Sequence, residues 1–166
     1  MKRVFVILAV VIGVLLAIVI GWRTSLRLSS EPLSTVQEQT LKRAIAVLEE
    51  KGFRQEAFLF RNIALFRSSA NWSLQGEGVD FQRMMAAVTY PMAVVTLFPG
   101  FFDPDLDDTE RASVLLHESY HLWGEGEAEA YRGVLQRRDQ LGWVESKYGE
   151  TALWLEIARA TKVYAP

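Results

Sequence analysis

The only two histidines of the 166-residue chain lie four positions apart, in the stretch HESYHLWGEGEAEAY at residues 117–131. Residues four apart share one face of an α-helix, so the imidazoles of His117 and His121 can bind one metal ion. Glu118 lies one step around that helix, where a carboxylate can take a proton from a metal-bound water. Zinc lowers the pKa of such a water to about 7. The H-E-x-x-H pattern therefore predicts a catalytic Zn²⁺ with Glu118 as general base.

A catalytic zinc has three protein ligands and one open position. The chain has no cysteine and no third histidine, so a carboxylate has to supply the third ligand. Gly124 and Gly126 let the chain turn back into a second helix, which brings Glu125, Glu127 and Glu129 into reach. Helical periodicity places Glu125 and Glu129 on one face and Glu127 nearly opposite. Spacing alone does not choose between them.

The motif resembles that of the gluzincin-type zincin metallopeptidases, which add a glutamate from the next helix to HExxH. In several members this glutamate begins an E-x-x-A-D pattern. EAEAY at residues 127–131 is similar to that pattern, with Tyr131 in place of the aspartate. Residues 117–127 also resemble the metzincin signature, with a glutamate where a histidine is usual. Both resemblances imply Glu127 as the third ligand, in a small and divergent zincin.

The resemblance implies a peptidase in which a zinc-activated water attacks a peptide carbonyl, with Glu118 as base and then proton donor. No histidine is left to stabilise the oxyanion, so zinc would do so together with Tyr131, Tyr120 or Arg132. Two other functions stay open. One is a non-catalytic, membrane-tethered binding module on the same fold, and the other is a zinc hydrolase of a non-peptide substrate.

The rest of the chain predicts an α+β fold, with a small zincin-like domain at residues 36–166. Apolar residues recur at helical spacing between caps and glycines, which predicts helices at 36–51, between Asp107 and Gly124, at 127–141 and at 151–163. Aromatic and β-branched runs between Phe53 and Phe102 predict a short mixed sheet of about three strands, although residues 55–66 could form a helix. The sheet is expected to pack on the helix that carries the motif and on the helices after it.

Zincins hold a peptide along an edge strand, and the resemblance makes MAVVTLF at residues 92–98 a candidate for it. A plain core strand is an equal alternative. The acidic run DPDLDD at residues 103–108 lacks the glycine and glutamate of an EF-hand loop, so we expect it to cap the following helix. Trp123, Trp143 and Trp154 are expected in the core or at an interface rather than as substrate platforms.

The N-terminal segment VFVILAVVIGVLLAIVIGW, residues 4–22, carries no charge. As a helix it would be about 28 Å long, enough to span a bilayer. We therefore expect a transmembrane anchor with its flanks at residues 1–27 and a linker at 28–35. A cleaved signal peptide is the alternative, but the apolar run is long for one and no small-residue cleavage site follows. The basic flanks favour a cytoplasmic N-terminus, with the domain outside the cytoplasm.

Charge limits the expected partners. The formal net charge is −2, but four of the 18 basic residues flank the apolar segment, so only 14 oppose the 20 acidic residues elsewhere. Such an acidic domain argues against nucleic acid as a ligand and leaves a peptide or protein substrate as the expected partner. The sequence does not indicate an oligomeric state.

Overall fold

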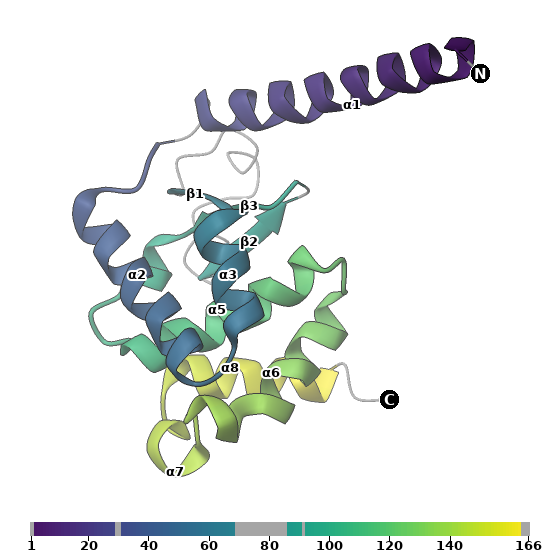
Figure 1. Cartoon of the computed structure of the whole chain (residues 1–166). Coiled ribbons are helices and arrows are strands. Elements are labelled where there is room, and N and C mark those ends of the chain that lie inside the picture. The colour runs from purple at the N-terminus through teal and green to yellow at the C-terminus, as the bar shows by residue number, and fades with distance from the viewer. Residues whose placement is uncertain (1, 29–30, 69–85, 91, 164–166) are drawn as a thin grey trace.

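The computed structural model describes residues 2–28, 31–68, 86–90 and 92–163 (Figure 1). The apolar helix α1 (Lys2–Leu28) extends from one end of a mixed α+β domain, as the sequence predicts. The elements of the domain are α2 (Thr35–Glu50), α3 (Arg54–Asn62), β1 (Leu65–Ser68), β2 (Ala87–Tyr90), β3 (Val94–Leu97), the 3-10 helix η2 (Pro99–Phe102), α5 (Asp108–Leu122), α6 (Glu127–Leu141), α7 (Glu145–Tyr148) and α8 (Ala152–Val163).

The sheet has three strands in the order β1-β3-β2, with β3 parallel to β1 and antiparallel to β2. The predicted mixed sheet of about three strands is thus confirmed. Strand β3 pairs on both sides and every residue of it is buried, because its sequence VVTL is apolar and β-branched. The interpretation of residues 92–98 as an edge strand is therefore wrong, and the core-strand alternative is confirmed. Among the described strands, β2 lies beside α5 and pairs on one side only, with β3.

Residues 55–66, which the sequence left between strand and helix, contain both. The first part belongs to α3, whose buried residues Ala57 and Phe60 are three positions apart and face the core, whereas Phe58 is exposed. The chain then leaves the helix and enters β1 at Leu65. Helical spacing of the apolar residues therefore outweighed their β-propensity in the first part.

Helix α5 lies in the middle of the domain, below the sheet and above α6–α8 in Figure 1. It packs against α2, α6 and β2, and every residue from 110 to 119 is buried. Asp107 caps its N-terminus by accepting hydrogen bonds from the amides of Thr109 and Glu110 at 2.9 and 3.0 Å. The predicted capping role of the acidic run is thus confirmed. Arg111 ties the helix to the preceding turn by donating to the carbonyls of Phe101 and Asp103.

The predicted helix at 127–141 is confirmed residue for residue as α6, which ends where Gly142 adopts a left-handed φ of 80°. Trp143 and Trp154 are buried with ring centroids 4.6 Å apart, so both belong to the core as expected. Trp123 is 61% exposed and does not belong to the core. The short elements η2 and α7 were not predicted.

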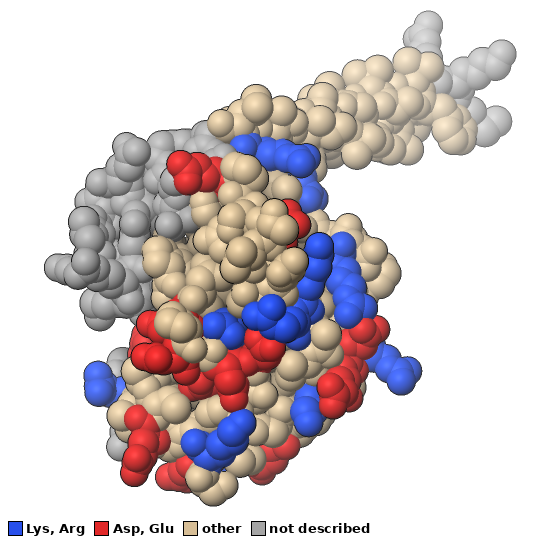
Figure 2. Space-filling view, turned by 90° about the vertical axis from the view of Figure 1, so that its left-hand side faces the viewer, with Lys and Arg blue, Asp and Glu red and all other residues tan. Residues whose placement is uncertain are grey.

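By length and composition, α1 could cross a membrane from Val4 to Leu28, although a signal sequence near the N-terminus passes the same test. Its last turns contact the domain. Leu26 is only 5% exposed, and the guanidinium of Arg23 donates to the carbonyl of Ile63 at 2.9 Å. On the face shown in Figure 2, the described part of α1 is uncharged beyond the basic residues at its base, and acidic and basic side chains are interspersed over the domain.

Candidate metal centre

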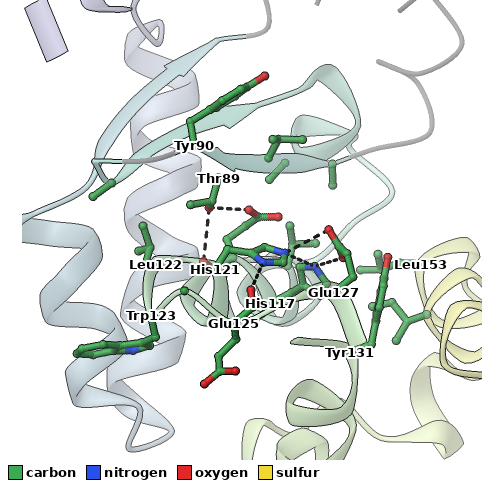
Figure 3. A pocket seen from close by; sticks show the side chains of 18 of the residues that line it. Thr89, Tyr90, His117, His121, Leu122, Trp123, Glu125, Glu127, Tyr131 and Leu153 are labelled. Atoms are coloured by element: carbon green, nitrogen blue, oxygen red, sulfur yellow. Dashed lines mark hydrogen bonds and ion pairs between the residues drawn. The ribbon is translucent and has the colours of Figure 1, made fainter. Parts of the chain in front are cut away.

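The side chains of His117, His121 and Glu127 converge on one point beside the sheet (Figure 3). The two Nε2 atoms lie 3.1 Å apart. The Glu127 carboxylate is 3.2 Å from Nε2 of His117 through Oε2 and 3.4 Å from Nε2 of His121 through Oε1. Of the three glutamates that spacing leaves open, the structure brings Glu127 to the histidines.

A sharp turn between two helices produces this convergence. Both histidines lie on α5, which ends at Leu122 with Trp123 as its C-cap. Gly124 follows with a left-handed φ of 86°, and Gly126 is the extended N-cap from which α6 starts at Glu127. Because Gly124 has no Cβ, it adopts this conformation without strain, and the chain reverses within three residues. Glu127 therefore stands in the first turn of α6, facing the last turns of α5.

The three donors fit a tetrahedral metal ion. For metal–nitrogen distances of roughly 2.0–2.1 Å, two ligands of a tetrahedral zinc lie about 3.3 Å apart. The two Nε2 atoms lie 3.1 Å apart, and Glu127 approaches them to 3.2 and 3.4 Å through its two different oxygens. One ligand atom from each of the three residues lies within 4.8 Å of the other two, which a small shift of the carboxylate brings to this spacing. Two imidazoles and one carboxylate also form a donor set that zinc uses in catalytic sites. The residues present therefore suit Zn²⁺ in both geometry and chemistry.

The orientation of His121 is set by the turn itself. Its Nδ1 lies 2.9 Å from the carbonyl oxygen of Glu125, which can accept a hydrogen bond from Nδ1–H. This tautomer leaves Nε2 with a lone pair directed at the other two donors. His117 is held differently: its buried Nδ1 has no hydrogen-bond partner among the described residues, and its ring packs against Tyr131 with centroids 4.5 Å apart. The sequence resemblance had left the orienting group open, and for His121 it is a backbone carbonyl.

Glu118 is 3% exposed and points toward β2. The hydroxyl of Thr89 donates to Oε2 of Glu118 at 2.7 Å, which fixes the carboxylate. Burial raises the pKa of Glu118, although the nearby His117 and the Thr89 hydrogen bond oppose this shift. A carboxylate whose pKa is raised accepts a proton more readily than a solvated one, as a general base requires.

The electrostatics of the cluster favour a cation. Hydrogen bonds from His117 and His121 hold the pKa of Glu127 well below its usual range. In turn, the Glu127 carboxylate raises the pKa of His121 to about 9. Both pKa shifts have the same cause, because the negative Glu127 carboxylate and a positively charged imidazole stabilise each other.

The remaining candidates from the sequence lie in different places. Tyr131 lines the cavity beside Glu127, whereas Tyr120 and Arg132 are not among the described residues that line it. Tyr120 packs against Gly133 on α6, and Nη1 of Arg132 lies 3.9 Å from Oε1 of Glu129. Of the three candidates for the oxyanion, Tyr131 is therefore the one that lies at the described cavity. Glu129 is held away from the cluster by the same helix that presents Glu127.

A cavity of about 810 Å³ opens beside the cluster. All five residues of the segment 86–90 line it, and their side chains alternate between the two faces of the sheet. The cavity therefore meets β2 along its edge. Another part of its wall comes from α8, whose residues Leu153, Glu156 and Ile157 line the cavity.

Sequence reasoning missed Thr89 and Glu156. Thr89 lies in a short apolar run and Glu156 on an ordinary amphipathic helix, and neither belongs to a motif. No local signal could have linked Thr89 to Glu118, which follows it by 29 residues.

Comparisons with protein families, characterised proteins and solved structures find no match to this chain. The resemblance to zincins consequently rests on the motif, and any function has to be argued from the site itself.

Proposed function

We propose that the protein is a zinc metallopeptidase attached to a membrane by α1. The observation that carries this proposal is the convergence of His117, His121 and Glu127, with the buried Glu118 beside them, at a cavity that meets the free edge of a strand. The donor set suits zinc, the carboxylate suits a general base, and the strand edge suits an extended peptide.

Each side chain has a role in this proposal. His117, His121 and Glu127 hold the metal, and the Glu125 carbonyl keeps Nε2 of His121 directed at it. When bound, zinc supplies a Lewis acid that polarises a carbonyl and lowers the pKa of a water molecule. Glu118 accepts the proton of the attacking water and returns it to the leaving amine. Thr89 holds Oε2 of Glu118, so that Oε1 is available for this transfer.

The edge of β2 is the proposed position of the peptide. Within the part of the chain that the structure describes, β2 pairs only with β3, so the backbone groups on its other side can pair with an added strand. Backbone pairing would hold the scissile carbonyl near the metal centre with little dependence on side chains. Tyr131, whose hydroxyl end points toward the Glu127 side of the cavity in Figure 3, is the proposed donor to the oxyanion.

Contacts between α1 and the domain favour an uncleaved anchor over a signal peptide. A signal peptide leaves the mature protein and has no reason to pack on it, whereas Leu26 is buried and Arg23 bonds to Ile63. Protein sequencing of the mature N-terminus tests this point. A mature chain that begins after α1 would contradict the anchor. Protease accessibility in intact cells then tests whether the domain lies outside the cytoplasm.

The first experiment measures the metal content of the full chain, purified in detergent without chelator. We expect one zinc per chain in the wild type and its loss in His121→Ala and Glu127→Gln. Glu129→Gln is the matched control, because Glu129 lies two residues after Glu127 on the same helix but outside the cluster. A folded wild type without metal, or a loss in Glu129→Gln equal to that in Glu127→Gln, would refute the site.

The second experiment separates a peptidase from a binding module. Glu118→Gln should retain zinc and fold but lose turnover of a mixed peptide library, because only the proton acceptor is removed. If the wild type cleaves no peptide and Glu118→Gln changes nothing, the binding module is supported. Turnover of esters or amides without turnover of peptides would support the non-peptide hydrolase.

A further inference from the structure

The cavity beside the metal centre is lined unevenly by charge. Its described lining contains four glutamates and neither lysine nor arginine. Glu118 and Glu127 belong to the metal centre, whereas Glu125 and Glu156 lie on other parts of the wall. A cleft whose charged side chains share one sign attracts ligand groups of the opposite sign.

Glu156 stands on a wall that is otherwise apolar. One face of α8 presents three residues to the cavity, because Glu156 and Ile157 follow Leu153 by three and four positions. Trp154 points elsewhere and packs on Trp143 in the core, which holds the helix in place. The wall therefore combines two aliphatic side chains with a single carboxylate.

Within the described residues, the Glu156 carboxylate forms no hydrogen bond or ion pair, and its recorded charge neighbour is Arg159. Arg159 acts on it electrostatically from the same helix but does not line the cavity. The Glu156 side chain is exposed at the cavity, so it is open to a ligand. Partial desolvation raises its pKa, and the charge of Arg159 opposes this shift. Such a group gains from a cation brought by a ligand.

We propose that this wall selects peptides with a lysine or arginine side chain at the position that contacts α8. The aliphatic part of the side chain would pack on Leu153 and Ile157, and its charged end would meet Glu156. This inference rests on the proposed function, because it assumes a peptide bound past the metal centre. It adds the substrate class, which neither the motif nor the metal ligands indicate.

The test measures the binding of fluorescent peptides to the full-length, zinc-loaded Glu118→Gln variant in detergent. The peptides share one neutral sequence and carry a single Lys, Gln or Glu at each position in turn. At one position we expect the Lys peptide to bind roughly fivefold to tenfold more tightly than the Glu peptide. Adding Glu156→Gln should remove most of this difference, and Glu156→Lys should reverse it. Glu145→Gln, which alters an exposed carboxylate on α7 outside the cavity lining, is the control.

Because binding does not need turnover, the two proposals fail separately. A lysine preference that depends on Glu156 supports the inference even if the wild type cleaves nothing, in which case the peptidase function fails. Equal binding of the three peptides, absence of binding, or a preference that survives Glu156→Gln overturns the inference. In each of these cases the inference fails even if the wild type cleaves peptides.

Discussion

The ring of Tyr120 on α5 lies directly against Gly133 on α6. A Cβ placed on Gly133 would lie 2.6 Å from Cε1 of Tyr120 and closer still to Cζ and the hydroxyl oxygen. The Arg137 guanidinium covers the ring at 5.6 Å from its centroid, which limits how far the ring can move. This contact joins the helix with both histidines to the helix with Glu127, so its geometry determines whether the three donors meet.

Gly133→Ala should therefore lower the free energy of unfolding, although alanine is the better helix former. The helix propensity of alanine favours the variant by about 1 kcal/mol. Overpacking costs roughly 1–3 kcal/mol, since the ring or the helix has to shift. The net loss is then up to about 2 kcal/mol, or a fall of several degrees in the melting temperature. We expect weaker retention of zinc in a chelator titration as well, because the shift moves Glu127 away from the histidines.

The Tyr120→Leu background reverses the sign of the effect. With the ring removed, Gly133→Ala has room for its methyl group and should raise stability by up to about 1 kcal/mol. Thermal unfolding of the four proteins in one detergent measures the cycle. If Gly133→Ala stabilises the chain with Tyr120 present, or destabilises it equally in both backgrounds, the close contact is not what restricts this position.

Three further predictions concern other parts of the domain. Asp107→Ala should cost about 1–2 kcal/mol through loss of the α5 cap. The pKa of Asp107 is lowered because hydrogen bonds from the Glu110 amide, Tyr148 and Lys147 outweigh burial. Asp107→Asn should therefore lose only the charge-dependent part of the stability, which is present above about pH 4 and disappears below it. Denaturant unfolding from pH 2.5 to 7 measures this difference, with Asp139→Asn as the control. Arg67 is buried, and among the described residues its guanidinium bonds to Thr96 through Nε and lies over the Tyr90 ring, whereas neither terminal nitrogen has a hydrogen-bond partner. Arg67→Met should therefore keep or raise the melting temperature, and a fall of several degrees would contradict this expectation. Thr89→Val should lower kcat roughly tenfold with little change in KM, and Thr89→Ser should restore it; equal loss in both variants would refute a positioning role.

Local chemistry made several features readable from the sequence. Asp107 could be identified as a cap and Gly142 as a stop because capping and left-handed backbone depend on residues within one turn. The shared face of His117 and His121 follows from the helical repeat alone. The apolar segment at residues 4–22 was equally plain, since length and hydrophobicity are sums over neighbouring residues.

Tertiary structure decided what depends on two distant segments. Spacing could not choose between Glu125, Glu127 and Glu129, because the answer depends on how α6 crosses α5. That crossing is determined by the turn at Gly124 and the packing of Tyr120 on Gly133. The hydrogen bond from Thr89 to Glu118 and the order of the strands likewise join segments that no short pattern connects. Hydrogen bonds and torsions within one turn fix a helix, but distances between helices and strands arise only when the whole core packs.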